Sequence, residues 1–294
     1  MFESGSPLVS PSTIFDIASV SKVMATTMMA AILYDRGMLD LATTVPGRDD
    51  LTIRRLLTHA SGLPAYVKFY DQTRDPREII ELAYATPLEA LPGSRTEYSD
   101  IGFIILGNAL EHLTGEPLDQ FCRRNVFAPL GLANTVFCPP ADMRDLIAPT
   151  EDDQTFRHKV IQGEVHDQNA WVMGGVAGHA GLFSTAYDVA TFAQCWLTGG
   201  PQLLNAATVS EFTRQQPNST RALGWDRPTP PSSSGRYFSG SSFGHLGFTG
   251  TSLWCDPEKE LAVVLLTNRT WPDARNQAIK QIRPLFHDAI VEAL

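Results

Sequence analysis

Residues 23–33 constrain the fold of this chain more than any other segment, because they predict a helix without a polar face. Two threonines are the only polar residues among them, so nearly every side of such a helix must contact other parts of the protein. The segment is shorter than the roughly 18 apolar residues that a membrane helix requires. Residues 14–39 therefore predict a strand end, a turn and a buried helix that ends at Gly37.

Length and charge narrow the class of protein. The chain has 294 residues, of which 43% are hydrophobic, which is compatible with one large domain or two closely packed domains. A net charge of -9 and the lack of any Lys/Arg run argue against a nucleic-acid partner. Residues 1–21 contain no Lys or Arg and no unbroken apolar stretch. A cytoplasmic location is therefore expected for the chain as written, and an extracytoplasmic one if its start is truncated.

The four cysteines are widely spaced and contain no C-x-x-C pair. This spacing favours reduced, buried, structural thiols over a disulfide framework, a zinc site or a nucleophile. They are Cys122, Cys138, Cys195 and Cys255.

Further helices follow the buried one. Residues 51–57 predict a short helix that stops before a cluster of turn formers, and residues 187–197 predict another. Residues 100–113 predict a helix that Ser99 or Asp100 caps and Gly115 ends.

The last third of the sequence changes character. Residues 174–181 contain four glycines among small residues, which suggests a close approach of the backbone to a site. Residues 226–242, rich in Pro, Ser and Gly, predict a long surface loop. Residues 248–254 and 261–266 predict an antiparallel hairpin, and a helix from about residue 274 is expected to close the chain.

Ser19 and Lys22 form an S-x-x-K motif at the start of the buried helix. Residues three apart share a helix face, and the backbone N–H groups at a helix start are free. A lysine in a partly desolvated site has a lowered pKa, so it can accept the proton of the neighbouring hydroxyl. The alternative is a helix-capping serine followed by a surface lysine.

Two other arrangements compete with this motif. Residues 240–244 match G-x-S-x-G, but a loop precedes Ser242 and a strand follows it, so Ser242 is expected to be a loop residue. His59 and His112 are interpreted as structural. Four side chains could be imagined as metal ligands, but their spacing matches no zinc pattern, so no metal is expected: His158, His166, His179 and Asp167. For residues 165–170 and 174–181, a role in ordering the loops through hydrogen bonds is favoured.

Residues 15–22, FDIASVSK, resemble the nucleophile segment of the class C β-lactamase and penicillin-binding-protein-like serine hydrolases, a family that includes esterases and D-aminopeptidases. Residues 51–64 are similar to another segment of that family, and Pro92-Gly93 with residues 98–100 resembles its Y-x-N element. Residues 245–251, HLGFTGT, resemble the H-x-G variants of its K-T-G element. The matches keep the family's order along nearly the whole chain.

The resemblance implies an α+β fold of the β-lactamase/transpeptidase type. An antiparallel sheet flanked by helices would comprise residues 1–18 and 172–294. A mostly α-helical inserted domain would comprise residues 19–171, with the active site in the cleft between them. Only about 18 residues precede Ser19, so either the start is truncated or this sheet dispenses with edge strands. No cofactor is implied.

The resemblance also implies roles for individual residues. Tyr98 would share proton transfer with Lys22, which requires a phenol pKa lowered by the nearby ammonium. The backbone N–H groups of Ser19 and Phe248 would form the oxyanion hole. Substrate-binding positions would be Asp100, His245 and Gly247.

Two of these positions depart from the family pattern. Asp100 stands where Asn is usual, so its carboxylate is expected to pair with Lys22 and raise the lysine pKa. His245 replaces a lysine and is expected to be mostly neutral near pH 7. Weaker binding of a substrate carboxylate at this position is therefore expected.

The sequence thus predicts a serine hydrolase that works through an acyl-serine intermediate, a carboxylesterase or amide hydrolase for small acyl substrates. A β-lactamase or D-alanyl-D-alanine carboxypeptidase is one alternative, and a penicillin-binding receptor that is acylated without turnover is another. The expected partner is a small ester, amide or β-lactam, with no nucleic acid and no membrane span.

Overall fold

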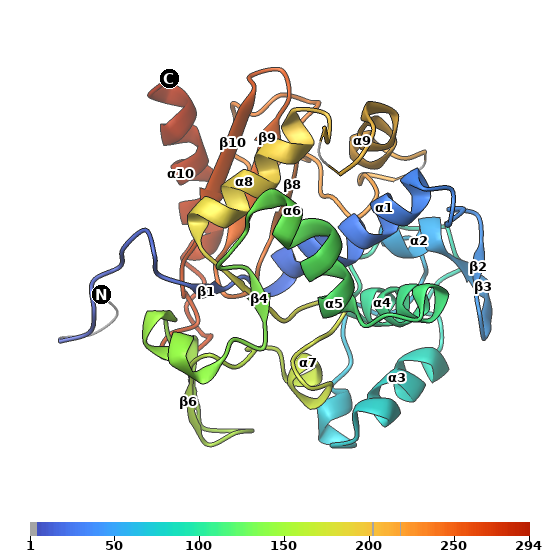
Figure 1. The fold of residues 1–294 in the computed structure, drawn as a ribbon, viewed down its shortest axis with the longest axis horizontal. Coiled ribbons are helices and arrows are strands. Elements are labelled where there is room, and N and C mark those ends of the chain that lie inside the picture. The colour runs from blue at the N-terminus through green and yellow to red at the C-terminus, as the bar shows by residue number, and fades with distance from the viewer. Residues whose placement is uncertain (1–4, 202, 218) are drawn as a thin grey trace.

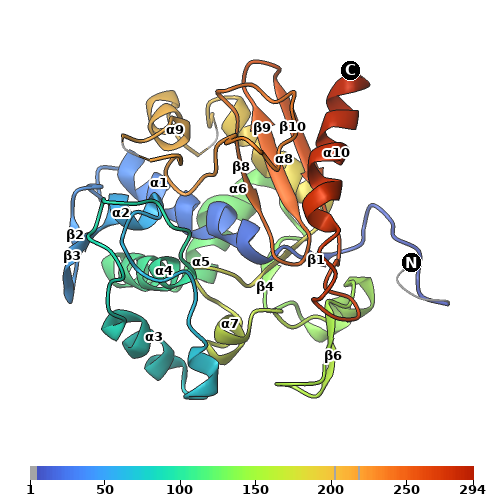
Figure 2. The same ribbon diagram turned by 180° about the vertical axis from the view of Figure 1, so that it is seen from behind.

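The computed structural model describes residues 5–201, 203–217 and 219–294. Its C-terminal part is an antiparallel sheet in the order β10-β9-β8. The strands are β8 (Phe243–Leu246), β9 (Ser252–Asp256) and β10 (Leu261–Leu265). Helix α8 (Ala186–Leu197) packs on β9 and β10, and α10 (Ile279–Glu292) packs on β10 (Figures 1 and 2).

The predicted hairpin is confirmed as β9 and β10, which pair from Leu261 with Asp256 to Leu265 with Ser252. Its first strand begins at Ser252, because residues 247–251 form a turn that is hydrogen-bonded to the chain before Ser19. None of residues 226–242 belongs to a helix or strand, as predicted for the loop. The closing helix begins at Ile279 instead of near residue 274.

A second sheet lies under the start of the buried helix, in the order β1-β7-β4. Its strands are β1 (Phe15–Asp16), β7 (Leu182–Ser184) and β4 (Val136–Phe137). Two hairpins complete the strands: β2 (Thr44–Val45) with β3 (Arg48–Thr52), and β5 (Glu151–Asp153) with β6 (Lys159–Ile161). The α+β class is therefore confirmed. The division into a sheet domain and an inserted helical domain stays a prediction.

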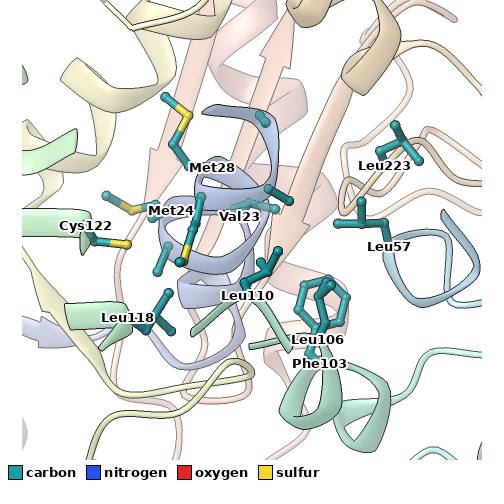
Figure 3. Packing of buried hydrophobic residues seen from close by; sticks show 14 of the residues in the cluster. Val23, Met24, Met28, Leu57, Phe103, Leu106, Leu110, Leu118, Cys122 and Leu223 are labelled. Atoms are coloured by element: carbon teal, nitrogen blue, oxygen red, sulfur yellow. The ribbon is translucent and has the colours of Figure 1, made fainter. Parts of the chain in front are cut away.

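The apolar segment after Ser19 is buried, as predicted. It consists of a 3-10 turn (Ala18–Val20), a π-helical stretch (Lys22–Thr27) and α1 (Met28–Asp35). Figure 3 shows side chains of this segment packed between α4 (Asp100–Thr114) and α5 (Leu118–Cys122). The helix thus forms the centre of the main hydrophobic core, which fixes the position of the serine at its start.

The caps of the neighbouring helices explain where they begin. The Ser99 hydroxyl accepts a hydrogen bond from the Gly102 N–H at 3.1 Å, and Gly115 ends α4 in the left-handed conformation, as predicted. Helix α2 (Ile53–Leu57) starts two residues later than predicted, because Thr52 caps it. The other helices are α3 (Pro76–Ala85), α6 (Ala128–Leu130), α7 (Gln168–Val172) and α9 (Ala206–Thr213), with shorter turns at Phe69–Asp71, Arg123–Phe127 and Ala141–Leu146.

All four cysteines are free thiols. Three of them are buried as predicted, but Cys138 is exposed, because it follows the short strand β4 at the protein surface. Among the described residues, no helix is long and apolar enough to cross a membrane.

Candidate active site

Ser19 lies in the tight turn that joins β1 to the buried helix. The preceding residue, Ala18, has a left-handed φ of 48°, and its N–H donates to the Asp16 carboxylate at 2.8 Å. The hydroxyls of Thr249 and Thr251 donate to the carbonyls of Asp16 and Ile17 at 2.8 and 2.9 Å. A backbone conformation that is unfavourable for alanine is thereby held in place, and it presents the Ser19 side chain to the surface of a cavity.

The structure brings Ser19, Lys22 and Tyr98 together. Lys22 Nζ donates to Ser19 Oγ at 2.9 Å, and the Tyr98 hydroxyl donates to the same oxygen at 2.8 Å. The two donors come from different parts of the chain, since Lys22 lies one turn after Ser19 and Tyr98 precedes α4. One hydroxyl between a lysine and a phenol is an arrangement suited to moving its proton.

Lys22 is fully buried and is surrounded by acceptors. Its ammonium lies 2.6 Å from Asp100 Oδ1 and donates to the carbonyl of His179 at 2.8 Å. Burial lowers the pKa of Lys22 below its usual value, while the charge of Asp100 raises it. The predicted pairing with Asp100 is therefore present, but burial is the larger influence and the net direction is downward.

The predicted lowering of the Tyr98 pKa is wrong. Burial raises the pKa of Tyr98 well above its usual value, and the charge of Asp100 raises it further. The hydrogen bond to Ser19 opposes these effects without overcoming them. Tyr98 is therefore a neutral phenol that donates its proton to Ser19 Oγ, and it lies 4.6 Å, ring centre to ring centre, from the buried His59.

The N–H groups of Ser19 and Phe248 donate to no hydrogen bond within the described part of the chain. Phe248 belongs to the 247–251 turn, which two arginines hold from outside. Arg283 donates to the carbonyls of Gly247 and Thr251, and Arg269 Nε donates to the Phe248 carbonyl at 2.7 Å. Two fixed, uncommitted amides beside a hydroxyl are what an oxyanion hole requires.

His245 lies on β8 and lines the same cavity as Ser19. Its Nδ1 lies 2.8 Å from the Leu246 carbonyl, and its buried Nε2 has no hydrogen-bond partner. Burial and the Lys22 ammonium keep the pKa of His245 well below its usual value, so the predicted neutral side chain is confirmed. Gly247 follows it, where a Cβ would lie 2.0 Å from Thr251 Oγ1.

Ser19 lies where two cavities meet. One, of about 430 Å³, is bounded by His245, Gly247 and α10. The other, of about 390 Å³, is bounded by residues 65, 66, 70, 151 and 166–168. Both cavities are lined by Ser19, Tyr98, Asp100 and Phe248. A substrate whose carbonyl lies at Ser19 can therefore place its acyl group in one cavity and its leaving group in the other.

The candidate metal ligands form pairs instead of a cluster. His179 Nε2 lies 2.8 Å from Asp167, and His166 Nε2 lies 2.6 Å from Glu151. Within the described ranges, no group of three or more His, Cys, Asp or Glu side chains could hold a metal ion. The Asp167–His179 pair fixes the loop whose carbonyl receives the Lys22 ammonium, in line with the predicted loop-ordering role.

Sequence reasoning missed Arg221, which lines the cavity beside His245. It belongs to no motif, and only the folded chain brings it over the ring of Tyr98, with Cζ 5.5 Å from the ring centre. Ser242 is buried immediately before β8, as expected of a residue outside the site, and it lines neither cavity.

Comparisons with known proteins identify the family and the fold. A family model described as Beta-lactamase matches residues 2–284. A protein of Escherichia coli K12 named "putative D-alanyl-D-alanine carboxypeptidase" is 35% identical over 300 residues, 87% of this chain and 69% of that protein. A β-lactamase structure from Mycobacterium bovis superposes with a TM-score of 0.70 at 22% identity, covering 97% of this chain and 89% of the other. The structure of EstCE1, described as a hydrolase with promiscuous acyltransferase activity, gives 0.72 at 23% identity, covering 95% and 86%.

Proposed function

Because the chain belongs to the beta-lactamase family of serine hydrolases, we propose that Ser19 is the nucleophile of an acyl-serine hydrolase for small esters and amides. One observation carries the assignment. Ser19 Oγ accepts hydrogen bonds from both Lys22 and Tyr98, beside two uncommitted amides and at the meeting point of two cavities.

In the proposed reaction, the neutral form of Lys22 accepts the Ser19 proton as Oγ attacks the acyl carbonyl. The N–H groups of Ser19 and Phe248 stabilise the negative charge that develops on the carbonyl oxygen. Tyr98 remains protonated, because burial raises its pKa, so it delivers a proton towards the leaving group and recovers one through Lys22. A water molecule then attacks the acyl-serine with the same groups acting in reverse.

The neutral side chain of His245 favours the proposal of uncharged small acyl substrates, because the permanent cation of a K-T-G element is absent at this position. EstCE1, which has a similar fold, is described as a hydrolase with promiscuous acyltransferase activity, and such a description is compatible with the transfer of an acyl group to Ser19. D-alanyl-D-alanine carboxypeptidase activity is the second candidate, because relatives at 35% identity carry that name. β-Lactam hydrolysis and acylation without turnover are the remaining candidates. The experiment described next distinguishes all of these functions.

The experiment compares wild type, Ser19→Ala and Ser242→Ala. Hydrolysis of p-nitrophenyl butyrate and nitrocefin is followed by stopped flow, and the acyl adduct is followed by intact mass. Ser19→Ala should abolish ester turnover and the adduct, whereas Ser242→Ala should retain both. A loss of at least about 10⁴-fold is expected for a nucleophile.

Other results of this experiment would favour the alternative functions. Rapid nitrocefin turnover would favour a β-lactamase, and a stable adduct without turnover would favour a receptor. Release of D-alanine from a D-alanyl-D-alanine peptide would favour the carboxypeptidase. Ester hydrolysis that survives in Ser19→Ala would falsify the assignment of the nucleophile.

A further inference from the structure

Tyr98 lies in a segment without regular secondary structure. Residues 95–99 belong to no helix or strand, and α4 begins at the next residue, Asp100. Yet the Tyr98 hydroxyl must lie 2.8 Å from Ser19 Oγ, and a shift of about 1 Å between reacting groups can cost about a hundredfold in rate. Contacts outside helices and strands therefore decide where this phenol lies.

The two residues that flank Tyr98 both donate a backbone N–H group to His59. The Glu97 N–H donates to the His59 carbonyl at 2.8 Å. The Ser99 N–H donates to Nδ1 of the His59 ring at 3.0 Å. The backbone of Tyr98 is thereby fixed on both sides by one residue.

The His59 ring also packs against the phenol itself. The ring centres of His59 and Tyr98 are 4.6 Å apart, and the ring of Phe103 on α4 lies 5.0 Å from that of His59. His59 is buried and lines neither of the cavities that meet at Ser19. It is therefore placed to act through Tyr98 and not by contact with a substrate.

The imidazole of His59 is neutral, and its proton is on Nε2. Burial keeps the pKa of His59 well below its usual value, and the charges of Arg221 and Lys22 lower it further. Because Nδ1 accepts the Ser99 N–H, the single ring proton must be on Nε2, which has no hydrogen-bond partner within the described residues. The Ser99 N–H is thus the partner that fixes the tautomer of this ring.

The neighbouring contacts make this hydrogen bond separable by mutation. The Ser99 hydroxyl donates to the Pro64 carbonyl at 2.7 Å, and the Asp100 N–H donates to the Ala65 carbonyl at 2.9 Å. These acceptors, like the His59 carbonyl, belong to the backbone and are present in any variant. Only His59 Nδ1 belongs to a side chain, so a substitution at this position removes that acceptor alone.

We propose that His59 is a positioning residue for Tyr98: its Nδ1 holds the Ser99 N–H and its ring supports the phenol, which directs the Tyr98 hydroxyl at Ser19 Oγ. The inference rests on the proposed hydrolase function, in which Tyr98 delivers a proton towards the leaving group, and adds to it a residue outside both cavities. A misplaced phenol should slow the departure of leaving groups that need this proton more than the departure of those that do not.

The test uses two butyrate esters with different leaving groups. The p-nitrophenolate of p-nitrophenyl butyrate is stable without a proton, whereas the alkoxide of ethyl butyrate requires one as it departs. The readout is the ratio of kcat/KM for the ethyl and p-nitrophenyl esters, so that damage common to both reactions cancels. Both rates are measured above the background of Ser19→Ala.

Two substitutions separate the acceptor from the ring. His59→Phe retains an aromatic ring without the acceptor and should lower the ratio about tenfold to hundredfold. His59→Asn places Oδ1 near the position of Nδ1, tolerates the left-handed φ of 54°, and should retain most of the ratio. His59→Gly also tolerates this φ and replaces His59→Phe if circular dichroism shows that His59→Phe does not fold. The matched control His112→Phe, at an exposed histidine of α4, should leave the ratio unchanged.

A double-mutant cycle tests whether His59 acts through Tyr98. Tyr98→Phe should lower the ratio at least as much as His59→Phe, and the two substitutions together should give no further loss. An unchanged ratio in His59→Phe, an equal loss in His59→Asn, or additive losses in the double variant would overturn the proposal.

Amide hydrogen exchange separates this proposal from the hydrolase assignment. By NMR, the Ser99 amide should exchange faster in His59→Phe than in wild type and His59→Asn, while the Asp100 amide, whose acceptor is the Ala65 carbonyl, should keep its protection. This comparison needs no turnover, so it stands even if hydrolysis survives in Ser19→Ala and the hydrolase assignment fails alone. Equal protection of the Ser99 amide in all three proteins contradicts the proposed hydrogen bond.

Discussion

At the scale of single residues, the pKa of Lys22 is set by two opposing influences. Complete burial lowers it, and the Asp100 carboxylate at 2.6 Å raises it. The base form that the proposed mechanism needs is therefore limited by Asp100, since a higher lysine pKa leaves less neutral amine at a given pH.

Asp100→Asn should shift the pH dependence of the reaction. Without the carboxylate, burial alone acts on Lys22, its pKa falls further, and neutral amine is present at lower pH. The acidic limb of kcat/KM for p-nitrophenyl butyrate should move down by about one pH unit or more. Asp142→Asn, a change at an exposed position, is the control and should leave the limb in place. A limb that stays or moves upward would contradict Lys22 as the base.

At the scale of secondary-structure elements, α10 acts on the site through the 247–251 turn. Arg283 of α10 is buried and donates to the Gly247 carbonyl at 2.5 Å and the Thr251 carbonyl at 2.9 Å. The Gly247 carbonyl and the Phe248 N–H belong to one planar peptide unit and point in opposite directions. A hydrogen bond that holds the Gly247 carbonyl therefore also fixes the direction of the Phe248 N–H. Burial and nearby Arg269 lower the pKa of Arg283 to about 10, which still leaves it charged near neutral pH.

Arg283→Gln should reduce kcat about tenfold to hundredfold with little change in KM. Arg283 is a positioning residue, and the oxyanion that the Phe248 amide stabilises exists only in the transition state. Steady-state kinetics with p-nitrophenyl butyrate measures the split, and Arg283→Lys should recover part of kcat. Arg236→Gln removes an exposed arginine that pairs with α10 away from the turn, so it is the control. Equal effects on kcat and KM in all three variants would indicate a structural role only.

At the scale of the whole molecule, the site depends on a close contact between α4 and residues 174–181. A Cβ on Gly178 would lie 2.1 Å from the Phe103 carbonyl oxygen, and one on Gly107 would lie 2.8 Å from Gly178 Cα. The same loop supplies the His179 carbonyl to Lys22 and the Gly178 carbonyl to Thr26. The glycines predicted to allow a close approach do so here.

Gly178→Ala should destabilise the fold and impair catalysis together. Forcing a methyl group against backbone costs about 3 kcal/mol, which lowers Tm on the order of 5–10 °C. Thermal denaturation measures the first effect and ester hydrolysis the second. Gly240→Ala is the control, because no atom lies within 4 Å of the position of its Cβ. A wild-type Tm in Gly178→Ala would show that the two segments separate easily.

Most local structure could be predicted because its causes lie close together in the sequence. The apolar run after Lys22 required burial, Ser99 and Gly115 marked the ends of α4, and the turn formers after Cys255 marked the hairpin. Ser19 and Lys22 share a helix face by spacing alone, and their contact follows from that geometry.

Only the tertiary structure decided the environment of these residues. Burial sets the direction of the Tyr98 pKa, and sequence reasoning had considered the ammonium alone. Arg221 and Arg283 reach the site from the chain before a long loop and from the last helix, so no local pattern marks them. The sequence by itself determined the reactive groups and the helices that carry them. Their charge states depend on distances between segments far apart in the chain, which are fixed only when the core packs.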